Sequence, residues 1–130
     1  MKRMKLIPFF ILALTTALTG CGKSNPGTYQ QVSPQEAISM MESEEDYIIL
    51  DVRTPEEFDA GHIPNAINLP NESISSAPTE LLPNKDQLIL VYCRSGNRSK
   101  QASGKLAKLG YTNIVEFGGI NHWPGELVTD

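Results

Sequence analysis

The chain has 130 residues, of which 40% are hydrophobic, and a formal net charge of −4 at pH 7. This length fits one ordinary globular domain with a single core. The excess of acidic over basic residues argues against a nucleic-acid partner.

The first 20 residues have the pattern of an export signal. Lys2, Arg3 and Lys5 form a short basic region, and residues 6–18 are almost wholly apolar. This apolar stretch is shorter than the roughly 20 residues that a permanent membrane-spanning helix needs. We therefore expect residues 1–20 to be cleaved and the protein to be exported. The 110 residues that remain would carry a net charge of −7, because three basic residues are lost.

Residues 18–21 (LTGC) resemble the lipobox of bacterial lipoproteins. In that family the cysteine thiol receives a diacylglyceryl group, so Cys21 would anchor the protein to a bacterial membrane, facing the periplasm or the cell exterior. The alternative is an ordinary signal cleaved nearby. Residues 21–29 are polar and rich in Gly, Pro, Ser and Asn, which predicts a flexible tether before a domain at residues 30–130.

Helix and strand patterns alternate along the first half of this domain. Residues 33–36 (SPQE) form a capping box that predicts a helix over 34–42. Residues 47–52 are a short β-branched run, typical of a strand buried on both faces. Residues 54–57 (TPEE) repeat the capping pattern and predict a short helix that Gly61 ends.

The second half continues the alternation. Residues 66–69 predict a short strand, residues 88–92 the strongest strand of the chain, and residues 97–109 an amphipathic helix that Gly110 ends. Residues 113–117 predict a last strand, which a turn-rich segment follows. This order indicates an α/β fold with a parallel sheet covered on both faces.

The carboxyl ends of two predicted strands carry Asp51 and Cys93, and ligands of parallel sheets bind at such ends. If Cys21 is lipidated, Cys93 has no intramolecular disulfide partner. Two arginines, Arg94 and Arg98, flank a glycine after it, and the helix that follows starts with unpaired backbone N–H groups. These features favour a reactive thiolate over an inert packing thiol.

The length of the loop separates two kinds of cysteine chemistry. Cysteine-dependent phosphatases and some arsenate reductases use a longer loop, because it must hold a tetrahedral oxyanion. Here four residues lie between Cys93 and Arg98. This tighter loop fits one sulfur atom carried on the thiol as a persulfide, and leaves a phosphatase or arsenate reductase as the less favoured alternative.

The chain resembles a single-domain rhodanese, a thiosulfate sulfurtransferase-like protein. The resemblance rests on CRSGNRS at residues 93–99, DVRTPEEF at 51–58, GHIPNAINLP at 61–70, and the closing glycines 118–119 with Trp123. It implies a rhodanese-like domain whose central, mostly parallel five-stranded sheet has helices on both faces. Many family members have glycine where Asn65 stands, and asparagine is the next residue to tolerate a positive φ angle.

The resemblance also implies a two-step sulfur transfer. The Cys93 thiolate would take the outer sulfur of a small anionic donor such as thiosulfate, and then pass it to cyanide or a thiol. The implied donor-binding and active-site loop comprises Arg94, Ser95, Gly96, Asn97, Arg98 and Ser99. Its backbone amides would stabilise the persulfide, its arginines would attract the donor, and the Ser99 hydroxyl would support the loop.

Two further residues are expected to support this site. Asp51 would hydrogen-bond to the loop or pair with Arg98, and Arg53 would pair with Glu57. His62 is expected to have a structural role rather than a catalytic one. No metal-ligand pattern is visible and no cofactor is implied. A module that only carries sulfur or binds a partner is the non-enzyme alternative, and the sequence leaves open an unidentified redox or sulfur-relay protein as partner.

Overall fold

The computed structural model describes residues 28–75 and 80–129. The predicted signal, the predicted lipidation site Cys21 and nearly all of the predicted tether lie outside these residues and stay predictions. In the described part of the chain, no helix has the length and apolar character needed to cross a membrane.

A single five-stranded parallel sheet forms the centre of the domain. Its strands are β1 (Gln30–Gln31), β2 (Tyr47–Asp51), β3 (Ile67–Asn68), β4 (Leu88–Cys93) and β5 (Ile114–Gly119). Their order is β1-β5-β4-β2-β3, and each pairing is parallel. The predicted α/β fold with a parallel five-stranded sheet is confirmed. β4 lies in the middle of the sheet and is buried along its whole length.

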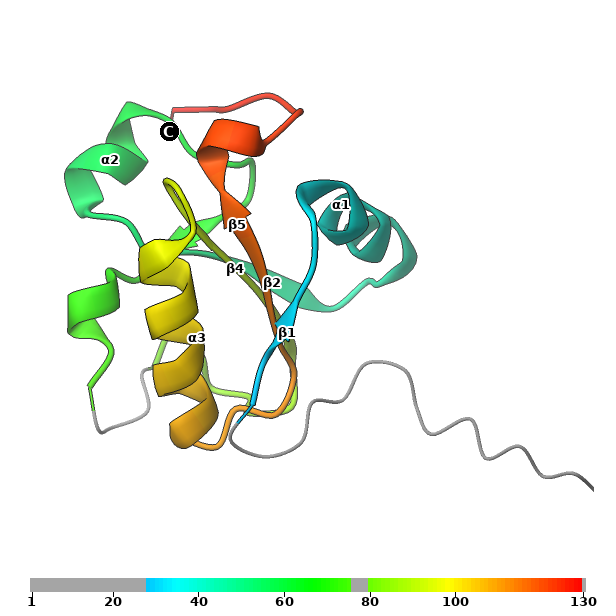
Figure 1. The fold of residues 1–130 in the computed structure, drawn as a ribbon, viewed down its shortest axis with the longest axis vertical. Helices are drawn as coiled ribbons and strands as arrows, with labels where there is room; N and C mark the ends of the chain where they lie inside the picture. The colour runs from blue at the N-terminus through cyan, green and yellow to red at the C-terminus, as the bar shows by residue number, and fades with distance from the viewer. Residues whose placement is uncertain (1–27, 76–79, 130) are drawn as a thin grey trace, which may run out of the picture.

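Helices cover both faces of this sheet, as predicted. They are α1 (Pro34–Ser43), α2 (Pro55–Ala60) and α3 (Asn97–Lys108), together with the short 3-10 helices η1 (Asn71–Ser73) and η2 (Ile120–His122). Both predicted N-caps are formed, since the side chains of Ser33 and Thr54 accept hydrogen bonds from the first turns of α1 and α2. Figure 1 shows α3 on one side of the strands and α1 on the other.

The side chains of β4 alternate between two hydrophobic clusters. Ile89, Val91 and Cys93 pack with Ala102 and Leu106 of α3. Leu88, Leu90 and Tyr92 pack with Ala37 of α1 and Phe58 of α2. Because successive side chains of a strand point to opposite faces, Cys93 is directed to the α3 face.

Three turn residues have the conformations that the sequence predicts for them. Gly61 caps α2, and Gly110, at φ +95°, follows the last turn of α3, where its N–H and that of Tyr111 bond to the last carbonyls of the helix. Asn65 has φ +69°, so asparagine does occupy a left-handed position there. His62 is buried and stacks on Phe58, with ring centroids 3.8 Å apart, in a structural position.

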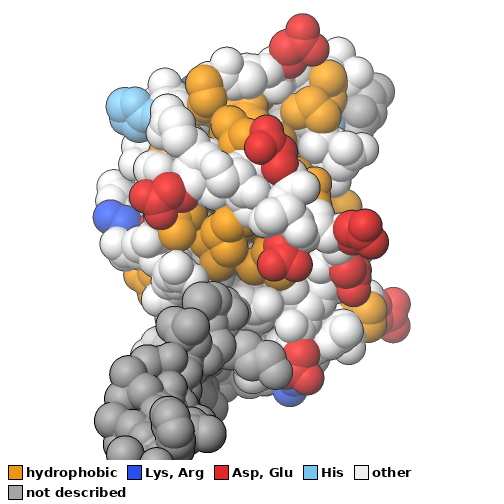
Figure 2. All heavy atoms as spheres, turned by 90° about the vertical axis from the view of Figure 1, so that its right-hand side faces the viewer, with side chains coloured by type: hydrophobic (Ala, Val, Ile, Leu, Met, Phe, Trp, Pro, Cys, Tyr) orange, Lys and Arg blue, Asp and Glu red, His pale blue; other side chains and the backbone are white. Residues whose placement is uncertain are grey.

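Two details differ from the prediction. The edge strand β1 has no counterpart in it, and Gly118 and Gly119, expected in a turn-rich segment, extend β5. A register shift between Val91 and Cys93 lets Cys93 pair with Gly119, so β5 continues beside the cysteine. On the face shown in Figure 2, acidic side chains stand around several hydrophobic ones, in keeping with the negative net charge.

Candidate active site

Cys93 is the last residue of β4, and its thiol is free and only 1% exposed. The backbone N–H of Gly96 donates a hydrogen bond to its Sγ at 3.0 Å. Gly96 has φ +106° and immediately precedes α3, so its left-handed conformation turns the chain from the strand into the helix. The sulfur therefore lies beside a backbone donor at the positive end of a twelve-residue helix.

Gly119 allows this loop to pack against β5. A Cβ atom at position 119 would lie 2.0 Å from the carbonyl oxygen of Arg94, which is far inside van der Waals contact. Asn121 in η2 also donates its N–H to the same carbonyl, at 3.3 Å. Gly119 is thus required by the close approach of the cysteine loop, whereas a Cβ at Gly118 would meet nothing and glycine suits that position through its φ of +91°.

Ser99 lies in the first turn of α3 and is fully buried. Its Oγ is 3.3 Å from Cys93 Sγ, 3.0 Å from the carbonyl oxygen of Gly96 and 2.6 Å from Glu116 Oε2. Glu116 is not among the residues predicted for the site. The sequence did contain a signal for it, because a glutamate within an apolar strand (IVEF) is predicted to be buried, and buried acids are rare without a hydrogen-bonding partner.

The remaining loop residues differ in exposure. Arg94, Ser95 and Asn97 are exposed, whereas Arg98 is partly buried. Arg94 lines the adjacent pocket, so its guanidinium is the loop cation available to an incoming anion.

Arg98 forms a two-pronged ion pair with Glu57 of α2, at 2.6 and 3.0 Å. The guanidinium that the sequence assigned to donor binding is therefore already paired in this structure. The expected Arg53–Glu57 pair is not formed, because Arg53 turns to Asp51 and leaves Glu57 to Arg98. The Arg98–Glu57 pair ties α2 to the beginning of α3.

The Arg98–Glu57 pair should make a contribution to the free energy of unfolding that is lost in acid. Its hydrogen bond from Arg98 lowers the pKa of Glu57 from 4.5 to about 2. A carboxylate whose pKa is lowered by folding stabilises the fold above its unfolded pKa, so this contribution is complete above pH 4.5 and is lost as the pH falls toward 2. Both side chains keep contact with solvent, so we expect the contribution to be no more than about 1 kcal/mol.

Glu57→Gln should remove this contribution. The unfolding free energy of the variant, measured by urea unfolding, should fall less steeply with acidification over that window than that of the unchanged protein. Glu44→Gln, at an exposed position, is the matched control. Identical slopes for Glu57→Gln and the unchanged protein would contradict the prediction.

Asp51 points away from the cysteine loop, contrary to the expectation that it contacts the loop or Arg98. Asp51 pairs in register with Tyr92, and Cys93 is the next residue along β4. A shift of one residue reverses the face of the sheet to which a side chain points. Asp51 and Tyr92 therefore share the α1–α2 face, while Cys93 lies on the α3 face.

On that opposite face, Asp51 is the centre of a buried polar network. Arg53 donates from Nε and Nη2 to its carboxylate, the latter at 2.6 Å, and from Nη2 to the carbonyl oxygen of Gly61 at 2.7 Å. The Tyr92 hydroxyl donates to Asp51 at 2.6 Å and accepts from the N–H of Ile63 at 3.1 Å. The network connects β2, β4 and the segment after α2 beneath the site.

The network alters two pKa values. Burial opposes the charge of Arg53, but the hydrogen bonds and charge of Asp51 outweigh it and raise the pKa of the guanidinium. Burial, with the hydrogen bond to Asp51, raises the pKa of Tyr92. Arg53 is thus held charged and Tyr92 neutral, as the hydrogen bonds require.

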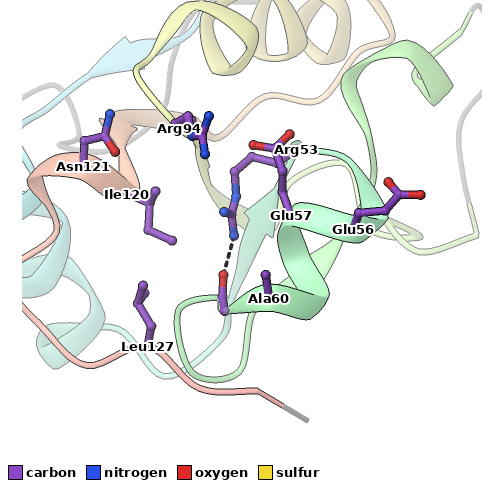
Figure 3. A pocket seen from close by; sticks show the side chains of 9 residues that line it. Arg53, Glu56, Glu57, Ala60, Arg94, Ile120, Asn121 and Leu127 are labelled. Atoms are coloured by element: carbon purple, nitrogen blue, oxygen red, sulfur yellow. Dashed lines mark hydrogen bonds between the residues drawn. The ribbon is translucent and has the colours of Figure 1, made fainter.

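A pocket of about 430 Å³ lies between α2, the cysteine loop and the C-terminal segment (Figure 3). Its lining residues are Arg53, Glu56, Glu57, Ala60, Gly61, Arg94, Ile120, Asn121 and Leu127. The walls thus include the first loop residue after the cysteine and the partner of Arg98. Among residues 28–75 and 80–129, no cluster of metal-ligating side chains is present.

The chain is similar in sequence and fold to known proteins. A family model described as Rhodanese-like domain matches residues 33–126. The chain is 36% identical over 104 residues to the adenylyltransferase and sulfurtransferase UBA4 of Candida albicans, covering 75% of this chain but only 24% of that protein. It is 35% identical over 71 residues to the thiosulfate sulfurtransferase PspE of Escherichia coli, covering 55% of this chain and 68% of PspE. A solved structure of a rhodanese-related protein from Thermoplasma volcanium is 31% identical, with a TM-score of 0.66 and coverage of 78% of this chain and 100% of that one.

Proposed function

This chain belongs to the rhodanese-like domain family, and from that premise we propose that it is a sulfurtransferase that carries sulfur as a persulfide on Cys93. Membership supports sulfur transfer as the general chemistry. The observation that carries the specific proposal is the free Cys93 thiol at the end of β4, to which the Gly96 N–H before α3 donates a hydrogen bond. A donor directed at the sulfur stabilises negative charge there, which both a thiolate and a persulfide require.

The proposed cycle has two balanced steps. The Cys93 thiolate attacks the outer sulfur of a donor such as thiosulfate, the S–S bond of the donor breaks, and sulfite leaves with the electron pair. An acceptor such as cyanide or a thiol then attacks the outer sulfur of the persulfide, and the Cys93 thiolate leaves. The exposed Arg94 at the pocket would attract the anionic donor.

Intact mass spectrometry tests the first step. After incubation with thiosulfate and desalting, the protein should gain one sulfur atom, and a reductant should remove it. Subsequent addition of cyanide should yield thiocyanate and return the original mass. Release of phosphate from an aryl phosphate without any gain of sulfur would instead assign the loop to the phosphatase alternative.

One observation favours a second candidate, a module that carries sulfur without turnover of small donors. Arg98 is paired with Glu57, so less positive charge of the loop is free to attract a small anion. On this reading, the sulfur would arrive from the persulfide of another protein. Loading by a protein persulfide but not by thiosulfate would favour this candidate.

We also propose that the protein is exported and lipid-anchored through Cys21, facing the periplasm or the cell exterior. Support comes from the basic region, the apolar stretch and the LTGC motif of the sequence. Incorporation of radiolabelled palmitate in bacterial cells, abolished by Cys21→Ser, is the expected result. Unlabelled protein in the soluble fraction would refute the anchor.

A further inference from the structure

Glu116 is a buried acid that the proposed sulfur chemistry does not yet use. It lies in β5, is 2% exposed, and occupies a position that faces α3 beside the hydrophobic cluster there. Its Oε2 accepts hydrogen bonds from the Gly118 N–H at 2.7 Å and from Ser99 at 2.6 Å. In the described part of the chain, no ion pair neutralises it. A buried charged carboxylate is costly unless it is paired or hydrogen-bonded, and here hydrogen bonds from Gly118 and Ser99 support it.

Ser99 connects this carboxylate to the reactive sulfur. A serine hydroxyl has one proton, and the shortest of its contacts is the one to Glu116. When the hydroxyl donates to the ionised carboxylate, its lone pairs face Cys93 Sγ at 3.3 Å and accept the thiol proton. The result is a continuous chain of hydrogen bonds from the Cys93 thiol through Ser99 to Glu116.

We propose that Glu116 is a positioning residue that receives the proton of Cys93 through Ser99. The inference rests on the proposed persulfide function and names what holds the thiol proton during it. The thiol proton passes to Ser99 Oγ, and the Ser99 proton passes to Glu116 Oε2. The S–H electron pair remains on Sγ and attacks the outer sulfur of the donor, whose S–S bond breaks as sulfite leaves. When the acceptor later removes the sulfur, the proton returns by the same route.

Charge explains why the proton should stay inside the site. A thiolate and a carboxylate buried on either side of Ser99 would repel each other, whereas transfer of the proton keeps one negative charge in the pair. Two groups around the sulfur favour negative charge there. The Gly96 N–H of the loop donates a hydrogen bond to Sγ. In α3, the pKa of Arg98 is raised mainly by its hydrogen bond with Glu57, and the charge of Cys93 makes a smaller contribution. From β1, the residue in register with Glu116 is the uncharged Gln31.

The rate of alkylation of Cys93 by iodoacetamide as a function of pH tests this proposal without any sulfur transfer. With the relay intact, the thiol proton has an acceptor inside the site, so alkylation below neutral pH should be faster than in variants that break the relay. In Glu116→Gln, the amide oxygen can accept both existing hydrogen bonds but cannot take up the proton. We expect alkylation at about pH 6 to slow by about tenfold or more and to rise with pH.

Ser99→Ala should produce the same profile, and the double variant should be no slower than either single variant, because all three break one relay. If Glu116 were only a fixed negative charge near the thiol, its removal would instead favour the thiolate, and Glu116→Gln would react faster below neutral pH. That result, or an unchanged profile, would overturn the proposal.

Two controls separate this outcome from loss of the fold and from failure of the proposed function. Thermal unfolding of both variants should remain cooperative, and Glu36→Gln, an exposed acid in α1, should leave the alkylation profile unchanged. Glu116→Gln should still gain one sulfur from thiosulfate at alkaline pH, where bulk base removes the thiol proton. If the unchanged protein gains no sulfur at any pH, the persulfide function fails, while the alkylation profiles report on the relay independently.

Discussion

Cys93→Ser is expected to abolish sulfur loading and sulfur transfer while the domain stays folded. A serine oxygen cannot form the sulfur–sulfur bond of a persulfide, so both steps of the cycle lose their carrier. The replacement is nearly isosteric, and its hydroxyl can still accept the hydrogen bond from the Gly96 N–H. Stability should therefore change far less than activity, which should fall to the uncatalysed background.

The second cysteine of the chain provides the matched control. Cys21→Ser should gain one sulfur from thiosulfate as the unchanged protein does, whereas Cys93→Ser should gain none. Intact mass and thiocyanate formation measure the two outcomes, and thermal unfolding verifies the fold. If sulfur loading survived in Cys93→Ser and disappeared in Cys21→Ser, Cys21 would be the sulfur carrier and the mechanism would be refuted.

Local signals made most of the fold predictable from the sequence. The capping residues Ser33 and Thr54 determine where α1 and α2 begin, through contacts within a few residues of each cap. The strand β4 and, up to Asp51, the strand β2 are continuous apolar runs, as expected for central strands of a parallel sheet. β1 escaped prediction because its two residues, Gln30 and Gln31, are polar and exposed, and only pairing with β5 makes them a strand.

In the site, too, local features were predictable from the sequence and contacts between distant elements were not. The Cys93 loop could be predicted because a strand end, a glycine and a helix start are adjacent in sequence. The partners of the charged residues could not, because they depend on how distant elements meet: Arg98 and Glu57 are 41 positions apart. The orientation of Asp51 depends on its register with β4, where an offset of one residue separates the face of Tyr92 from the face of Cys93.

Asp51→Asn is expected to lower the free energy of unfolding by about 3–5 kcal/mol, the usual cost of breaking a buried ion pair by removing one partner. The Arg53 side chain is 6% exposed and that of Asp51 is fully buried, so the guanidinium would be left without a counter-charge away from water. Asparagine keeps the size of the side chain, but its amide group would turn N–H donors toward the donors of Arg53 and Tyr92. The loss comes from the unpaired charge rather than from a cavity.

Glu57→Gln is the natural comparison for this prediction, because it removes the acid of the other ion pair. That pair is partly exposed, with side-chain values of 34% for Arg98 and 22% for Glu57, so its loss should cost no more than about 1 kcal/mol near neutral pH. Urea unfolding of the two variants, with equal m-values as a check that the same transition is compared, measures the difference. If Asp51→Asn lost no more stability than Glu57→Gln, the network around Asp51 would be replaceable by water, and burial of the Arg53 guanidinium would not be what makes that pair essential.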